Sequence, residues 1–295
     1  VFSYTVQSGD TTSDLAYTGA SSLALNGGTI LDNANNSAIL TLPTVGGTGS
    51  LSDSSAVVVD GVRPAFTAGA TTGGTKSLVL SLGEAVSGAP EVGDFAVTVN
   101  SVANTVTAVS AASDSTSITL TLTNFVTNSS TVAVAYTANS ETAKQLSDAS
   151  GNTVANDSSV SSITVTNDTN APTVSSVSSN TADDTYNIGD VIEIAVALSE
   201  VVTVTGTPQL TLETGATDRT ADYASGSGTN TLVFSYTVQS GDTTSDLAYT
   251  DTSALSFGDG IIEDQAGNIS VLTLLDAGSF GSLSGSSEIL IDTSG

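Results

Sequence analysis

The sequence predicts an all-β chain built from tandem antiparallel β-sandwich modules. Three observations lead to this prediction: apolar residues alternate with small polar ones, a long segment is repeated, and no segment shows a convincing amphipathic helical pattern. The chain has 295 residues, and the 39% that are hydrophobic argue against disorder despite the low content of Lys and Arg. At roughly 100 residues per sandwich, this length suits two to three modules.

Alternation with a period of two runs through most of the chain. Leu78, Leu80 and Leu82 are separated by single residues, and runs of the same kind lie at 118–123 and 132–136. This pattern is typical of half-buried antiparallel strands that place one face on a core. Clusters of Gly, Asn, Asp and Ser separate the runs at intervals near the roughly 8 to 12 residues usual in sandwiches. We therefore expect modules of the immunoglobulin-like type, with almost no helix.

An internal repeat divides the chain. Residues 1–18 recur letter for letter as residues 233–250, an offset of 232, and the similarity continues with falling identity as far as residue 61. Pro64 and Pro172 each follow a polar linker, where proline suits the start of an edge strand. The predicted domains are the C-terminal half of a module (1–61), a complete module (62–170) and a second complete module (171–295) whose second half repeats 1–61.

The composition argues against an enzyme. Cys, His, Met and Trp are absent, which removes thiolate and imidazole nucleophiles, the commonest general base and the soft metal ligands. Only a mechanism that uses carboxylates alone stays open in principle. With 30 Asp and Glu against 4 Lys and Arg, the surface repels polyanions, so nucleic acid and anionic membrane are poor partners. No apolar run approaches the ~20 residues of a membrane span.

Three kinds of acidic position recur in the two complete modules. Each module has a Glu at the end of an early strand, an Asp-x-x-Gly-Asn loop that begins 64 residues later (148 − 84 and 264 − 200), and a linker Asp. We predict that these side chains converge at one end of each sandwich and bind Ca²⁺, which prefers hard oxygen ligands. The predicted ligands are Glu84 and Asp148 with Asp60 or Asp168, then Glu200 and Asp264 with Asp168 or Asp292, and the loop residues Asn152 and Asn268.

A second interpretation treats the same loops as turns and nothing more. An Asp can bond to its own backbone in a turn, while Gly and Asn tolerate a positive φ. The half-module supports this interpretation in part, because its loop carries Asn35 where the other two loops carry Gly151 and Gly267. Both interpretations stay open on the sequence alone.

Short motifs in the middle of the chain resemble a known class of repeats. They are Gly93-Asp94-Phe95 followed by Val97, Val99, Val102 and Asn104, and then the loop from Leu146 to Asn152. They resemble the repeats named after a swimming-motility surface protein of marine cyanobacteria, which also occur in giant type I-secreted adhesins and in other bacterial surface proteins with immunoglobulin-like or cadherin-like arrays. The resemblance covers 62–170 best and 171–295 more loosely. It implies an extracellular repeat protein and calcium loading.

These observations predict a structural or adhesive repeat segment of a giant extracellular protein at a bacterial cell surface. We expect an extended, calcium-stiffened fibre or stalk whose partners are neighbouring copies of the same array, joined head to tail or covalently continuous. A surface glycan or another cell-surface ligand is a further candidate partner. The rival hypothesis is a displayed adhesin module that binds glycan or ice, although 7 Tyr, 7 Phe and no Trp leave no evident aromatic platform for a sugar.

Overall fold

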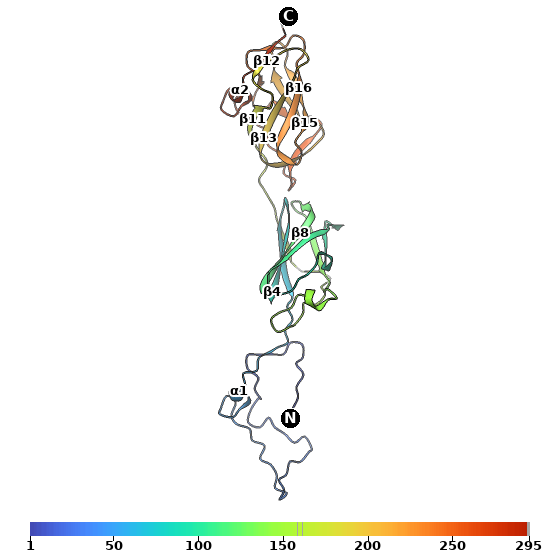
Figure 1. Ribbon diagram of the computed structural model, residues 1–295, viewed down its shortest axis with the longest axis vertical. Helices are drawn as coiled ribbons and strands as arrows, with labels where there is room; N and C mark the ends of the chain where they lie inside the picture. The colour runs from blue at the N-terminus through green and yellow to red at the C-terminus, as the bar shows by residue number, and fades with distance from the viewer. Residues whose placement is uncertain (158, 161, 294–295) are drawn as a thin grey trace.

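The computed structural model describes residues 1–157, 159–160 and 162–293. The chain is an elongated row of three bodies along one axis, with the N-terminal residues at one end and the C-terminus at the other (Figure 1). Strands account for 43% of the structure and helices for 5%. The predicted all-β class is confirmed, and the described helices are far too short to cross a membrane.

The middle body consists of two sheets around one core. Its elements are β3 (Phe66–Thr72), β4 (Thr75–Val86), η1 (Val92–Asp94), β5 (Phe95–Val99), β6 (Val102–Ala103), β7 (Val106–Ala111), β8 (Ser115–Val126), β9 (Val132–Tyr136), η2 (Thr142–Lys144) and β10 (Ile163–Thr166). One sheet has the order β10-β3-β4-β8-β7 and the other β6-β5-β9. Leu78 and Leu80 of the first sheet and Phe95 and Val134 of the second are buried in the same core. The two sheets therefore stack face to face.

The C-terminal body repeats this plan with a larger sheet. Its elements are β11 (Val174–Ser179), β12 (Asp184–Tyr186), β13 (Val191–Thr205), β14 (Gln209–Glu213), β15 (Arg219–Ser225), β16 (Thr229–Thr237), β17 (Thr243–Thr244), β18 (Ala248–Tyr249), β19 (Leu255–Ser256), β20 (Ile261–Asp264), α2 (Leu283–Ser286) and β21 (Ile289–Asp292). The main sheet follows β11-β13-β16-β15-β14-β18, with β19 on β14 and β20 on β13, and the second follows β12-β21-β17. Ile194, Phe234 and Ile289 meet in its core.

The N-terminal body has little regular structure. It contains β1 (Thr11–Thr12), α1 (Leu51–Ser54) and β2 (Val59–Asp60). β1 pairs with β2, while residues 1–10 form no strand. Both hydrophobic cores of the described chain lie in the other two bodies, so the apolar residues of this segment stay largely exposed.

The pairing register shifts at the same place in the two long central strands, at a β-bulge or a similar irregularity. The register of β4 against β8 shifts between Ser81 and Val86, and that of β13 against β16 shifts between Ala197 and Val202. Glu84 and Glu200 lie inside the two shifted segments. A bulge bends its strand and re-aims the side chains within it. Each Glu therefore lies outside the regular pairing of its strand.

Candidate cation sites at the module junctions

Three carboxylates come together at each of the two junctions. In each group, one carboxylate oxygen from every residue lies within 4.8 Å of the others. Oxygens that share one Ca²⁺ at about 2.3–2.6 Å are separated by up to roughly twice that distance, so the spacing suits this ion. The first group is Asp60, Glu84 and Asp148, and the second is Asp168, Glu200 and Asp264.

Each group joins two successive bodies of the chain. Asp60 ends β2 of the N-terminal body, whereas Glu84 and Asp148 belong to the middle body. Asp168 likewise follows the last strand of the middle body, while Glu200 lies on β13 and Asp264 ends β20. An ion bound to all three oxygens would therefore bridge a module to the linker before it.

The structure shows which of the alternative linker Asp residues lies in each acidic group. Asp60 lies beside Glu84, and Asp168 lies in the second group. Asp292 is in neither group and ends β21 opposite Thr243. Asp60 ends β2 opposite Thr11 in the same way, at an offset of 232. Asp292 therefore occupies in the C-terminal module the position that Asp60 occupies in the N-terminal body.

The loop asparagines orient the acids in this structure. The Asp148 carboxylate accepts the backbone N–H of Asn152 at 2.8 Å and its Nδ2 at 2.9 Å. Asp264 accepts the same two groups of Asn268 at 2.8 and 2.7 Å. Asn152 Nδ2 also donates to the backbone oxygen of Asp60 at 3.0 Å. Asn152 and Asn268, predicted as ligands, thus present a donor nitrogen to the acidic groups.

The turn interpretation also describes these loops correctly. Gly151 and Gly267 have φ values of +88° and +89°, in the left-handed region that glycine tolerates best. In the N-terminal body Asn35 takes this conformation at φ 65°, and the Asp32 carboxylate again accepts the backbone and side chain of Asn36. The turn places each loop Asp, so a turn and a cation site are compatible.

Asn128 strengthens the second junction and was not found from the sequence. Its Nδ2 donates to the backbone oxygen of Asp168 at 2.7 Å, and its Oδ1 accepts the backbone N–H of Asp168 at 2.8 Å. Its backbone N–H reaches the carbonyl of Ala266 in the C-terminal module at 3.1 Å. In a chain rich in Asn, one turn residue gives no signal of such a role. A cavity of about 320 Å³ lined by all three acids of the second group lies at this junction.

The acidic groups carry uncompensated negative charge. Burial and then the neighbouring Asp148 and Asp60 raise the pKa of Glu84. Glu200 has a raised pKa for the corresponding reasons. Burial opposes ionisation of Asp148, but hydrogen bonds from Asn152 and the loop backbone outweigh it and lower its pKa. In the described part of the chain, no ion pair joins a Lys or Arg to either group.

The comparison with known families bears on this region. Residues 54–141 match the model of a "Putative flagellar system-associated repeat". The matched segment is 88 residues long (141 − 54 + 1), which is less than a third of the chain, and contains Asp60 and Glu84. This match supports the expectation of a repeat from a bacterial surface protein. No curated protein matches the chain.

Solved structures of a bacterial S-layer protein show a weak likeness to the chain. The N-terminal part of SbsC is 14% identical, over 58% of this chain and 43% of that one, with a TM-score of 0.30. A longer portion of SbsC is 13% identical, over 71% of this chain and 31% of that one, with a TM-score of 0.31. The chain thus spans less than half the length of these structures, and TM-scores this low do not establish a common fold.

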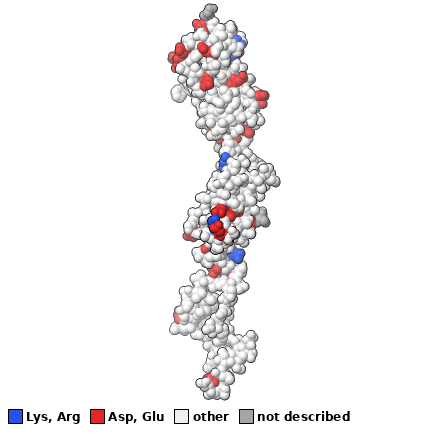
Figure 2. Space-filling view, turned by 45° about the vertical axis from the view of Figure 1, so that its right-hand side comes forward, with Lys and Arg blue, Asp and Glu red and all other residues white. Residues whose placement is uncertain are grey.

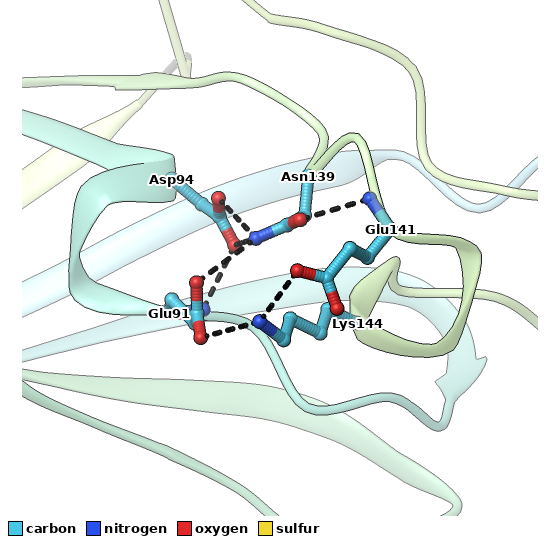
Figure 3. A network of polar contacts seen from close by, with 5 residues as sticks. All are labelled: Glu91, Asp94, Asn139, Glu141 and Lys144. Carbon is cyan, nitrogen blue, oxygen red and sulfur yellow. Dashed lines mark hydrogen bonds and ion pairs between the residues drawn. The ribbon is translucent and has the colours of Figure 1, made fainter.

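A separate polar network in the middle body contains its own cation, Lys144 (Figure 3). Lys144 Nζ lies 2.9 Å from Glu91 Oε1 and 3.0 Å from Glu141 Oε1. Asn139 Nδ2 donates to Asp94 Oδ1 at 3.1 Å. The hydrogen bonds with Glu91 and Glu141 raise the pKa of Lys144, which keeps it charged. This network ties the segment before β5 to the segment after β9.

Because the pKa values of Glu84 and Glu200 are raised, we expect the folded chain without Ca²⁺ to become more stable as the pH falls below 7. A carboxyl whose pKa is higher in the folded than in the unfolded state binds protons more readily when folded, so protonation stabilises the fold. In chelator, the melting temperature is expected to rise as the pH falls from 7 through the raised pKa values of the two folded Glu side chains, because Asp residues with lowered pKa values keep their contribution down to the unfolded Asp pKa of about 4. Scanning calorimetry measures this. The Glu84→Gln/Glu200→Gln variant should show a smaller rise, and an equal rise would contradict the assignment.

Proposed function

We propose that the chain is a structural repeat segment of a large extracellular bacterial surface protein, in which Ca²⁺ at the junctions holds successive modules in line. One observation carries this proposal: an equivalent set of three carboxylates, two from Asp and one from Glu, lies at each junction. In each set the residues come from two successive bodies. The match to the repeat family supports the proposal that the chain is a repeat of a bacterial surface protein. The elongated row of bodies suits a fibre or stalk (Figure 1).

The energetics favour a divalent cation at these positions. Three carboxylates within 4.8 Å repel one another, and burial together with this repulsion raises the pKa values of Glu84 and Glu200. A bound Ca²⁺ replaces repulsion by attraction and links the linker Asp to the module that follows. Extracellular modules bind Ca²⁺ at about 10⁻⁴ to 10⁻³ M. The net charge of −26 keeps neighbouring arrays apart and soluble.

Calcium is expected to stabilise the two junction modules measurably. Binding to the folded state alone adds RT ln(1 + [L]/Kd), or about 1.4 kcal/mol at ten times Kd. Scanning calorimetry in chelator and in millimolar Ca²⁺ should show a higher melting temperature with the ion, and titration calorimetry should detect two sites. Glu84→Gln should remove the first site, and Glu200→Gln the second.

A matched control lies on the same strand as one ligand. Glu193 is an exposed residue of β13 outside the acidic group, so Glu193→Gln should leave both sites intact. A melting temperature that does not change with Ca²⁺ would overturn the calcium proposal. Stabilisation that survives in the Glu84→Gln/Glu200→Gln double variant would show that the ion binds elsewhere.

A further inference from the structure

Residues 1–61 expose side chains whose counterparts in the C-terminal module are buried. Phe2 is 88% exposed and Tyr4 63%, while Phe234 and Tyr236, at the same places in the repeated sequence, are 0% and 1% exposed. In the space-filling view the N-terminal body is almost free of charged residues (Figure 2). Apolar side chains that are exposed here and buried in the other copy mark a candidate interaction surface.

The exposed half already has much of the local structure of its buried counterpart. β1 pairs with β2 in the same register as β17 with β21. The N–H of Leu15 donates to the carbonyl of Val57 at 2.7 Å, and that of Leu247 donates to Ile289 at 2.8 Å. Helices α1 and α2 are also capped in the same way, each by a Ser side chain. The segment therefore keeps part of the local structure of 233–293, although it forms no counterpart of β16.

The C-terminal module shows what that cover is. Within β13, Ile192 and Ile194 stand opposite Tyr236 and Phe234 of β16. β12 pairs with β21, and β14 pairs with β18 and β19. All three covering strands lie within residues 171–232. This segment covers what residues 233–293 would otherwise expose.

One ion pair shows which charged group the covering segment supplies to the half that it covers. Arg219 Nε of the covering segment lies 2.9 Å from Asp242 Oδ1, and the side chain of Asp242 is 1% exposed. Asp10 is the counterpart of Asp242, and Tyr4 donates to it as Tyr236 donates to Asp242. Among the described ion pairs none includes Asp10. The N-terminal surface thus has the acid that an Arg at the position of Arg219 would neutralise.

We propose that residues 1–61 are the acceptor half of a third module and bind a second copy of the segment 171–232. The chain holds two acceptor halves, 1–61 and 233–293, but one covering segment, which is already packed against 233–293. Exchange between two such chains would leave one acceptor open per chain. The occupant is therefore an additional copy. In the C-terminal module Leu232 continues directly into Val233 within β16, so a copy fused before Val1 would have the same connection as that module.

The repeated sequence supplies a sensitive test. A chain with a second copy of residues 171–232 fused before Val1 is compared with the 295-residue chain by hydrogen–deuterium exchange. The peptides 3–15 and 235–247 have the same sequence, so one mass envelope reports both copies. The 295-residue chain should give two equal populations, one exchanging fast and one slowly. The fused chain should lose the fast population.

The control carries Ile192→Asp and Ile194→Asp in the added copy alone, which removes the apolar contact with Phe2 and Tyr4 while the original module stays unchanged. Its fast population should persist. Two outcomes would overturn the proposal: a fast population that is unchanged in the fused chain, or a single slow population in the 295-residue chain while it is monomeric.

Discussion

Replacing Phe234 by Ala is expected to lower the free energy of unfolding of the C-terminal module by about 3–5 kcal/mol, the usual cost of removing a buried Phe. Phe234 is fully buried on β16, and Tyr223 packs edge-on against its ring at a centroid distance of 6.1 Å. The same change at Phe2 should cost less than about 0.5 kcal/mol, the usual limit for surface substitutions. The two positions share one local sequence, so the difference measures the covering segment alone.

Urea denaturation followed by hydrogen exchange separates the modules in one experiment. Peptides from β13 report the C-terminal module, and peptides from β8 serve as an internal reference for the middle module. Phe234→Ala should lower the urea midpoint of β13 and leave that of β8 unchanged. Equal effects of Phe2→Ala and Phe234→Ala would show that the N-terminal body is already packed.

Replacing Arg219 by Ala is expected to destabilise the same module by about 3 kcal/mol. Removing one partner of a buried ion pair leaves an uncompensated charge, which costs roughly 3–5 kcal/mol, and Arg219 is one-quarter exposed, which favours the lower end. Burial opposes ionisation of Asp242, yet hydrogen bonds from Tyr236 and Arg219 outweigh it and lower its pKa. Asp242 therefore stabilises the folded module above about pH 4, the pKa of an Asp carboxyl in the unfolded chain. This contribution is lost as the pH falls through the lower pKa that Asp242 has in the folded module.

Arg63→Ala is the matched control, because Arg63 is exposed and belongs to none of the described ion pairs. It should change stability by less than about 0.5 kcal/mol. The urea midpoint of β13 at pH 7 distinguishes the two variants. A fall in that midpoint for Arg219→Ala no larger than for Arg63→Ala would contradict the buried-pair argument.

Period-two alternation was enough to predict the strands. Leu78, Leu80 and Leu82 are all buried on β4, as their spacing indicates, because alternate residues of a strand share one face. Residues 1–5 behave differently: the same five letters form the end of β16 at 233–237, but they form no strand here. Local sequence does not decide strand formation there, because the hydrogen-bonding partner lies on another segment.

The candidate sites were partly predictable for a similar reason. The equal spacing of Glu84 to Asp148 and of Glu200 to Asp264 identified pairs that the structure brings together. The choice of linker Asp depends on which end of a module faces which linker, and sequence spacing does not contain that information. Nor does it say whether an Asn side chain presents its oxygen or its nitrogen, so the part played by Asn152 emerges only from the hydrogen bonds.

The repeat offset has a consequence for how the gene can change. The distance from Glu84 to Glu200 and from Asp148 to Asp264 is 116 residues (200 − 84 and 264 − 148), so the 232-residue offset spans two modules. Unequal recombination between the duplicated segments adds or deletes two modules at once and rejoins the chain within equivalent strands. Every inherited module then keeps its own covering segment, and every junction keeps its three acids. In the longer array that we propose, such exchange would change the length in steps of two modules.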